Sequence, residues 1–135
     1  MSVGAGRLRT MPVLTGLRVG AVLAVGVVML ALVGLTPAFS WIPEVPLLLV
    51  AAFIPLLGYG IAGYRSALMT HRVRDGIVAG AIAGVLSGAI GGMSYVAFGK
   101  PLLNLIVGPA IGAIGGGAVG AVAALLALRR TGSPS

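Results

Sequence analysis

Side chains able to do acid–base, nucleophilic or metal chemistry are scarce in this sequence of 135 residues. It has one histidine, His71, two acids, Glu44 and Asp75, and no cysteine. A zinc site needs three or four Cys, His or carboxylate ligands, and no such set can be assembled around His71. We expect no Ser-His-Asp triad either, because Glu44 and Asp75 are the only acids that could complete one. We therefore expect a non-enzymatic protein with no catalytic, cofactor-binding or metal-binding residues and no cofactor.

Two other sequence signals point to ligands, and both have a simpler explanation. The glycine cluster GAIGGG at 112–117 is not a phosphate-binding loop, because it lies in an apolar stretch and no Gly-Lys-Ser/Thr follows it. The net charge of +7 invites a nucleic-acid partner. However, no basic stretch is interleaved with aromatic residues, and membrane topology accounts for nearly all of the positive charges. We expect no nucleic-acid binding.

The polar residues expected to be buried within the apolar stretches are few: Tyr59, Ser87, Ser94 and Asn104. Ser87 belongs to a row of small residues, and its hydroxyl can bond a carbonyl of the preceding turn. We expect it to serve packing, with a place in a pore lining as the alternative. Asn104 follows Lys100 and Pro101, where capping or contact with lipid headgroups is expected.

The composition of the chain indicates what kind of secondary structure carries these residues. The chain is 59% hydrophobic and 8% charged, with a mean hydropathy of +1.14, whereas soluble domains carry about 25% charged residues. These values exclude a soluble globular domain, a disordered chain and a coiled coil. Uncharged runs cover 19–43, 45–64, 76–99 and 101–128, and about 20 apolar residues suffice for a helix to cross a membrane.

We therefore predict an all-α fold, an integral membrane four-helix bundle, formed by a single transmembrane domain over 1–135. The four spans are expected at about 17–36, 45–64, 76–98 and 102–128. The alternation of period two that a membrane β-barrel requires is absent from these runs.

The placement of charge predicts the orientation. Eight arginines fall before the first span, between spans 2 and 3, or after span 4, and only Lys100 falls on the other side. The positive-inside rule then places both termini in the cytoplasm. One alternative is a cleaved signal peptide ending near Ala38-Phe39-Ser40, which would leave three spans. If all four spans are retained, Asp75 is expected to cap span 3, and 65–75 is expected to be an exposed loop.

Some of these arginines lie where anionic lipid headgroups would be, and each can gain about 1 kcal/mol there. We expect the lipid bilayer and its anionic headgroups as partners of these side chains: Arg65, Arg72, Arg74, Arg129 and Arg130.

Rows of glycine at four-residue spacing are the most specific motif. Residues at i and i+4 share one face of a helix, and small residues let helix backbones approach closely in lipid. We predict glycine-zipper packing of the third and fourth helices, using Gly76, Gly80, Gly84, Gly88, Gly92, Gly108, Gly112, Gly116 and Gly120.

Shorter small rows occur in the other spans, at Gly16, Gly20 and Ala24 and at Gly58 and Ala62. With so many small faces, some are expected to build a homo-oligomer or a larger membrane complex. The alternative is that one compact bundle uses them all. Pro55 and Pro109 each remove a helical hydrogen bond and favour a bend in their spans.

The segments IAGY at 61–64 and RDGIVAGAIAGVLSGAIGG at 74–92, with the Gly-rich last span, carry a resemblance. Over about 34–128 the chain resembles Gly-rich four-span prokaryotic membrane proteins of unknown function. The resemblance implies no activity, so no functional residue follows from it. Small multidrug carriers and fluoride channels are rejected, because the acidic residue and the polar motifs of those families are missing here.

The sequence thus indicates a small multi-pass protein with a structural, accessory-subunit or self-assembling role. The alternative is a small oligomeric channel or uncoupled transporter, and a third reading is a membrane anchor that recruits a partner through 65–75. Eight arginines to one lysine, with abundant Ala, Gly and Val, indicate GC-rich coding. That bias favours a prokaryotic cytoplasmic membrane as the location.

Overall fold

The computed structural model describes the backbone of residues 3–132, and the side chains of that range except 3–9, 35, 44 and 48. It confirms an all-α architecture of four long apolar helices packed together. The elements are α1 (Val3–Leu35), a 3-10 turn η1 (Pro37–Phe39), α2 (Glu44–Thr70), α3 (Val73–Ala97) and α4 (Asn104–Arg130).

Each helix contains a segment long and apolar enough to cross a membrane. These segments are Thr10–Gly34, Val45–Thr70, Val73–Ala97 and Asn104–Arg130. In the backbone of such a helix the hydrogen bonds are made within the segment, as a lipid environment demands.

The bundle has large apolar side chains outside and small ones inside. Val22 and Ile114 are 73% and 75% exposed, whereas Ala62, Ala79 and Ala124 are fully buried. A soluble protein of this size buries its large hydrophobic residues instead. The exterior therefore suits an apolar surrounding, and the interior suits close contact between helix backbones.

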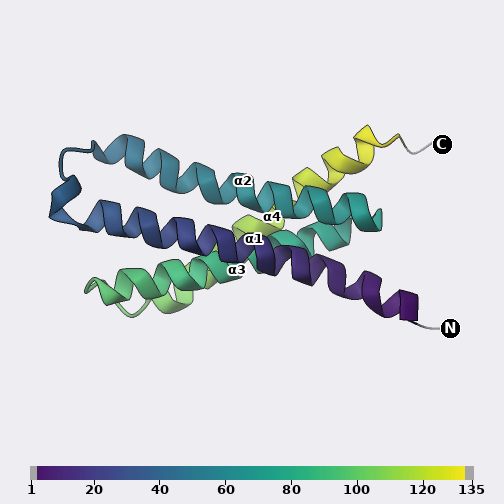
Figure 1. The fold of residues 1–135 in the computed structure, drawn as a ribbon, viewed down its shortest axis with the longest axis horizontal. Coiled ribbons are helices and arrows are strands. Elements are labelled where there is room, and N and C mark those ends of the chain that lie inside the picture. Colours follow the sequence, from purple (N-terminus) through teal and green to yellow (C-terminus); the bar gives the residue numbers. More distant parts are fainter. Residues whose placement is uncertain (1–2, 133–135) are drawn as a thin grey trace.

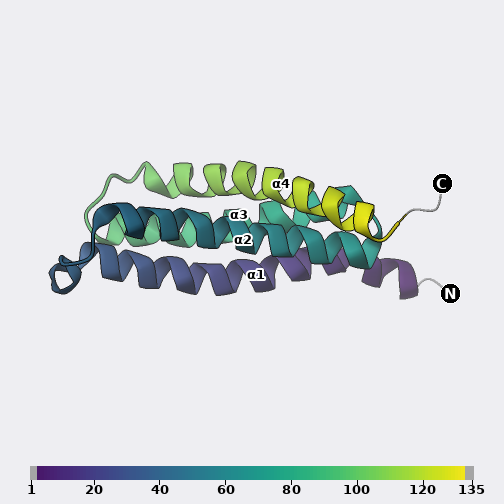
Figure 2. The ribbon, with the colours of Figure 1, turned by 90° about the horizontal axis from the view of Figure 1, so that it is seen from above.

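The helices run alternately up and down the bundle (Figure 1). Both described ends of the chain lie at the same end as the α2–α3 turn, and the α1–α2 and α3–α4 connections lie at the opposite end. Figure 2 shows α1 and α4 on opposite sides, with α2 and α3 between them. In the described part of the chain α1 and α4 do not contact each other, and the α3–α4 interface is the most extensive.

Helices extend beyond the predicted spans where arginines flank the apolar run. α1 begins at Val3 rather than near 17, and α2 continues past Arg65 to Thr70. The predicted exposed loop at 65–75 is wrong, since only His71 and Arg72 interrupt the helices. Charge ends an apolar segment but not a helix, because arginine is a good helix former.

The α2–α3 turn is stabilised by a backbone hydrogen bond and not by a side-chain cap. His71 adopts the left-handed conformation at φ 55° and its N–H donates to the Ala67 carbonyl at 2.8 Å, as in common helix C-caps. The predicted cap by Asp75 is wrong. Arg72 occupies the N-cap position of α3, and Asp75 lies inside the first turn without a capping hydrogen bond.

Prolines lie within three helices without ending them. Pro12, Pro55 and Pro109 fall inside α1, α2 and α4. Their missing N–H groups each remove one helical hydrogen bond, and the helices continue on both sides.

Candidate functional site

The α3–α4 interface brings two helix backbones into direct contact. A Cβ added to Gly84 would overlap the carbonyl oxygen of Gly112, and a Cβ added to Gly112 would overlap that of Gly84. Gly80 with Gly116 and Gly88 with Gly108 have the same reciprocal geometry, and the series ends at Gly92 against the Asn104 carbonyl. At the other end the contact of Gly76 with Gly120 is one-sided: a Cβ on Gly120 would overlap the Gly76 carbonyl, whereas a Cβ on Gly76 would meet Ala124 Cβ at 2.5 Å. We call these pairs the glycine ladder.

The ladder follows from spacing in an antiparallel pair. Each step of four residues along α3 matches four along α4 in the opposite sense, so one row faces the other along the interface. Only a hydrogen atom fits at these positions, and every predicted zipper glycine of both helices takes part.

The shorter rows also pack within this one chain. Gly16 and Gly20 of α1 lie against Ala79 and Ala83 of α3, and Gly58 of α2 lies against Leu23. Gly63 meets the carbonyl of Gly120, 2.6 Å from where its Cβ would be. Among the described helical glycines, only Gly26 and Gly115 would have open space around a Cβ. The rows are therefore occupied by neighbouring helices of the same chain.

The buried polar side chains bond to one another or to the backbone. The hydroxyls of Tyr59 and Ser87 lie 2.8 Å apart, and Ser87 Oγ donates to the Gly84 carbonyl at 3.3 Å. Because a carbonyl only accepts, Tyr59 is the donor to Ser87. Ser66 Oγ donates to the Asp75 carbonyl at 3.1 Å. Within the described part, no buried side-chain polar atom lacks a partner.

The other two polar residues singled out in the sequence form hydrogen bonds with backbone carbonyls three or four residues away. Ser94 Oγ donates to the Ile90 carbonyl at 2.8 Å, and Asn104 Nδ2 donates to the Pro101 carbonyl at 3.0 Å. A crevice of about 520 Å³ opens beside Tyr59, Ser87 and Asn104. Three of the polar side chains that line it, those of Tyr59, Ser87 and Asn104, are engaged in hydrogen bonds of the protein itself.

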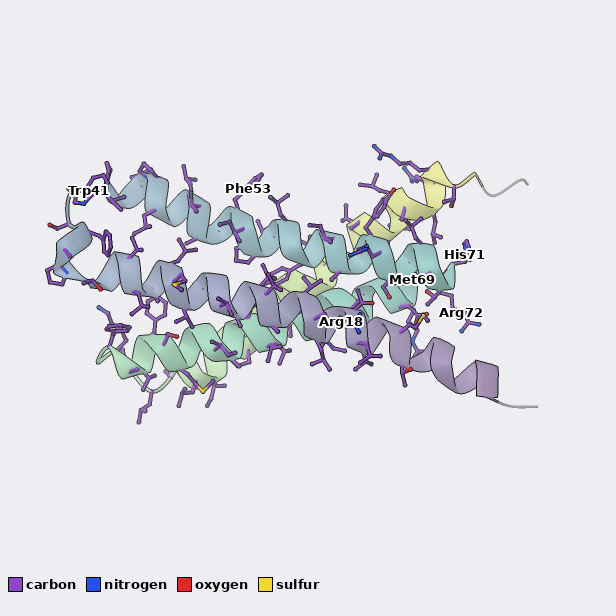
Figure 3. All side chains as sticks on the ribbon, in the orientation of Figure 1. Arg18, Trp41, Phe53, Met69, His71 and Arg72 are labelled. Carbon is purple, nitrogen blue, oxygen red and sulfur yellow. The ribbon has the colours of Figure 1, made fainter. Side chains whose placement is uncertain are left out.

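Arginines flank the α2–α3 turn and end α4. Figure 3 shows Arg72 and His71 at the α2–α3 turn, with Trp41 at the far end. All five arginines predicted to meet headgroups are exposed: Arg65, Arg72, Arg74, Arg129 and Arg130. Arg65 also lines a cavity of about 530 Å³ together with Arg18 of α1.

A second cavity, of about 700 Å³, runs between α2 and α4. It extends from Phe53 to Arg65 on α2 and from Ala118 to Arg130 on α4. We call it the α2–α4 groove. Sequence reasoning missed it because it depends on how two helices distant in the chain cross. The only signal in the sequence was the presence of arginine directly after the apolar run of each helix.

The described residues form no cluster of metal-binding side chains. They include no group of three His, Cys, Asp or Glu side chains that could hold a metal ion, and His71 is exposed at the turn. Comparison with protein-family models, curated proteins and solved structures finds no match to this chain.

Proposed function

We propose that the chain is a non-enzymatic integral membrane protein of four spans with a structural, accessory-subunit or self-assembling role. The observation that carries this proposal is the distribution of side-chain size, with large apolar groups outside and Ala and Gly inside. An exterior of this kind is stable in lipid and prone to aggregation in water.

The proposed packing device is a glycine zipper between α3 and α4. The glycine ladder supports it, because lipid provides little hydrophobic drive for helix association and close backbone contact supplies van der Waals attraction instead. Contacts of Gly16 and Gly20 with α3 support retention of α1 as a span rather than its removal as a signal peptide.

The proposed topology has both termini in the cytoplasm of a prokaryotic cell. It is supported by the shared end of the two termini and the α2–α3 turn, and by the eight arginines assigned to that side. Self-assembly or binding to a larger complex would then use outward-facing large side chains, since the small rows are occupied within the chain.

A structural role is favoured over a channel by the buried hydrogen bonds. In the channel alternative, a wet path would pass Ser87, Ser94 or Tyr59. The hydroxyls of Tyr59 and Ser87 instead bond to each other, and Ser87 also donates to the Gly84 carbonyl. None of the buried residues that the structure describes is an acid or a base. Intramembrane ionisable groups are the usual markers of ion pathways.

Membrane fractionation and liposome flux test this proposal. The protein should stay in the pellet after alkaline carbonate extraction, and purified protein in liposomes should pass K⁺, protons and small solutes no faster than protein-free liposomes. Release into the carbonate supernatant would contradict membrane integration. Flux above the protein-free control would contradict the structural role and favour the channel.

A further inference from the structure

We propose that the α2–α4 groove binds one anionic phospholipid, with an acyl chain between the helices and the phosphate between Arg65 and Arg130. This inference rests on the proposed membrane integration. It adds a defined site and a ligand class to the general contact of arginines with headgroups.

The groove has an apolar body. Leu57 and Ile61 of α2 and Val122 and Leu126 of α4 line it, and these side chains are between 52% and 59% exposed. Side chains that face an unfilled groove lose dispersion contacts on that side. A flexible apolar acyl chain in the groove would restore these contacts.

The polar end of the groove is cationic. Arg65 and Arg130 both line it and both are exposed. Within the described part of the chain, neither guanidinium has a hydrogen-bond or ion-pair partner. Guanidinium groups match phosphate oxygens in bidentate geometry, and basic pockets between spans on the cytoplasmic side recognise anionic headgroups.

The length of the groove fits one leaflet. From Phe53 to Arg65, and from Ala118 to Arg130, a helix rises about 18 Å. A single leaflet contributes about 15 Å of a hydrocarbon core roughly 30 Å thick. A lipid of the cytoplasmic leaflet would therefore place its headgroup at the arginines and its chain along the groove.

Native mass spectrometry of the detergent-solubilised full chain tests this site. Phosphatidylglycerol and phosphatidylcholine with identical chains are added in turn. We expect retention of one phosphatidylglycerol, and about fivefold weaker retention for each arginine removed, or roughly 25-fold for Arg65→Gln with Arg130→Gln, as about 1 kcal/mol per charge implies.

Arg74→Gln with Arg129→Gln is the matched control, because it removes the same charge and neither residue lines the groove. Equal loss in this control would show general surface attraction and overturn the site. Equal retention of phosphatidylcholine and phosphatidylglycerol would also overturn it. Added inorganic phosphate should not compete, and full competition would show a site for phosphate alone.

Gly60→Leu tests the acyl-chain part. A Cβ at Gly60 meets only Val119 Cγ1 at 3.7 Å, so the leucine enters the groove without striking the backbone. Retention of lipid should fall several-fold, while Gly26→Leu, where nothing lies within 4 Å of the Cβ, should not change it. Unchanged lipid retention in Gly60→Leu would overturn the chain placement.

If a second copy of the protein occupied the groove, the same spectra would show a dimer. That dimer would be lost in Gly60→Leu while lipid retention stayed unchanged. This result would overturn the proposal. Far-UV circular dichroism and thermal unfolding verify that each variant is folded. Carbonate extraction separates the two proposals, because a membrane-integrated protein without selective lipid retention refutes the site alone.

Discussion

At the residue scale, the rare polar groups of the interior serve packing. Tyr59 is 7% exposed and Ser87 is 2% exposed, and they link α2 to α3 through their hydroxyls. Since Ser87 donates onward to the Gly84 carbonyl, the pair is fixed beside the middle of the glycine ladder. Its polar atoms are satisfied, so burial costs little.

Removing one hydroxyl should weaken the bundle modestly. We expect Tyr59→Phe to lower the free energy of unfolding by about 0.6–1 kcal/mol, because hydrogen bonds between spans contribute about that much. Unfolding in mixed detergent, followed by circular dichroism, measures it. In a double-mutant cycle with Ser87→Ala the two effects should couple, and full additivity would show that the bond contributes nothing.

At the element scale, α3 and α4 form a hairpin whose closest contacts are between glycine backbones. The reciprocal overlap at Gly84 and Gly112 shows that the two backbones approach as closely as sterics allow. Glycine is unfavourable within a helix by roughly 1 kcal/mol relative to alanine. Its use here is explained by the contact and not by helix formation.

A single methyl group should distinguish contact glycines from free ones. Gly84→Ala should destabilise the protein by about 3 kcal/mol or more, because the methyl overlaps a carbonyl oxygen and α4 must shift. Gly115→Ala is the control on α4, since nothing lies within 4 Å of its Cβ, and it should stabilise by about 0.5–1 kcal/mol. Equal effects in unfolding experiments would contradict the ladder.

At the scale of the whole molecule, the bundle has two different ends. The termini and the α2–α3 turn, with Arg72, share one end, and Trp41 and the other connections lie at the opposite one (Figures 1 and 3). Such asymmetry is what the positive-inside rule acts on during insertion.

The absence of cysteine makes topology directly measurable. Single variants Ser40→Cys, in the α1–α2 connection, and Thr131→Cys, just after α4, report the two ends. On intact cells a membrane-impermeant maleimide should label Ser40→Cys, and Thr131→Cys only after permeabilisation. The reverse pattern would contradict the proposed orientation. Labelling of both from outside would indicate fewer spans.

Much of the architecture could be predicted from sequence because it depends on local composition. Four apolar runs without charge gave four helices, and period-four glycines gave two small faces. The ends were predicted less well. α2 continues through Arg65, and the turn depends on His71 in a left-handed conformation and not on Asp75. Hydropathy reports what a segment can bury, whereas helix ends are decided by backbone hydrogen bonds.

The four apolar helices were predictable from the sequence, because the length and charge of an apolar run are properties of a single segment. Which helix faces meet is established by the fold. It showed that the small rows are occupied inside one chain, that Tyr59 and Ser87 bond to each other, and that α2 and α4 cross to leave a groove ending in Arg65 and Arg130. These features depend on how helices far apart in sequence are placed relative to one another. The residue pattern along a single helix carries no information about that placement.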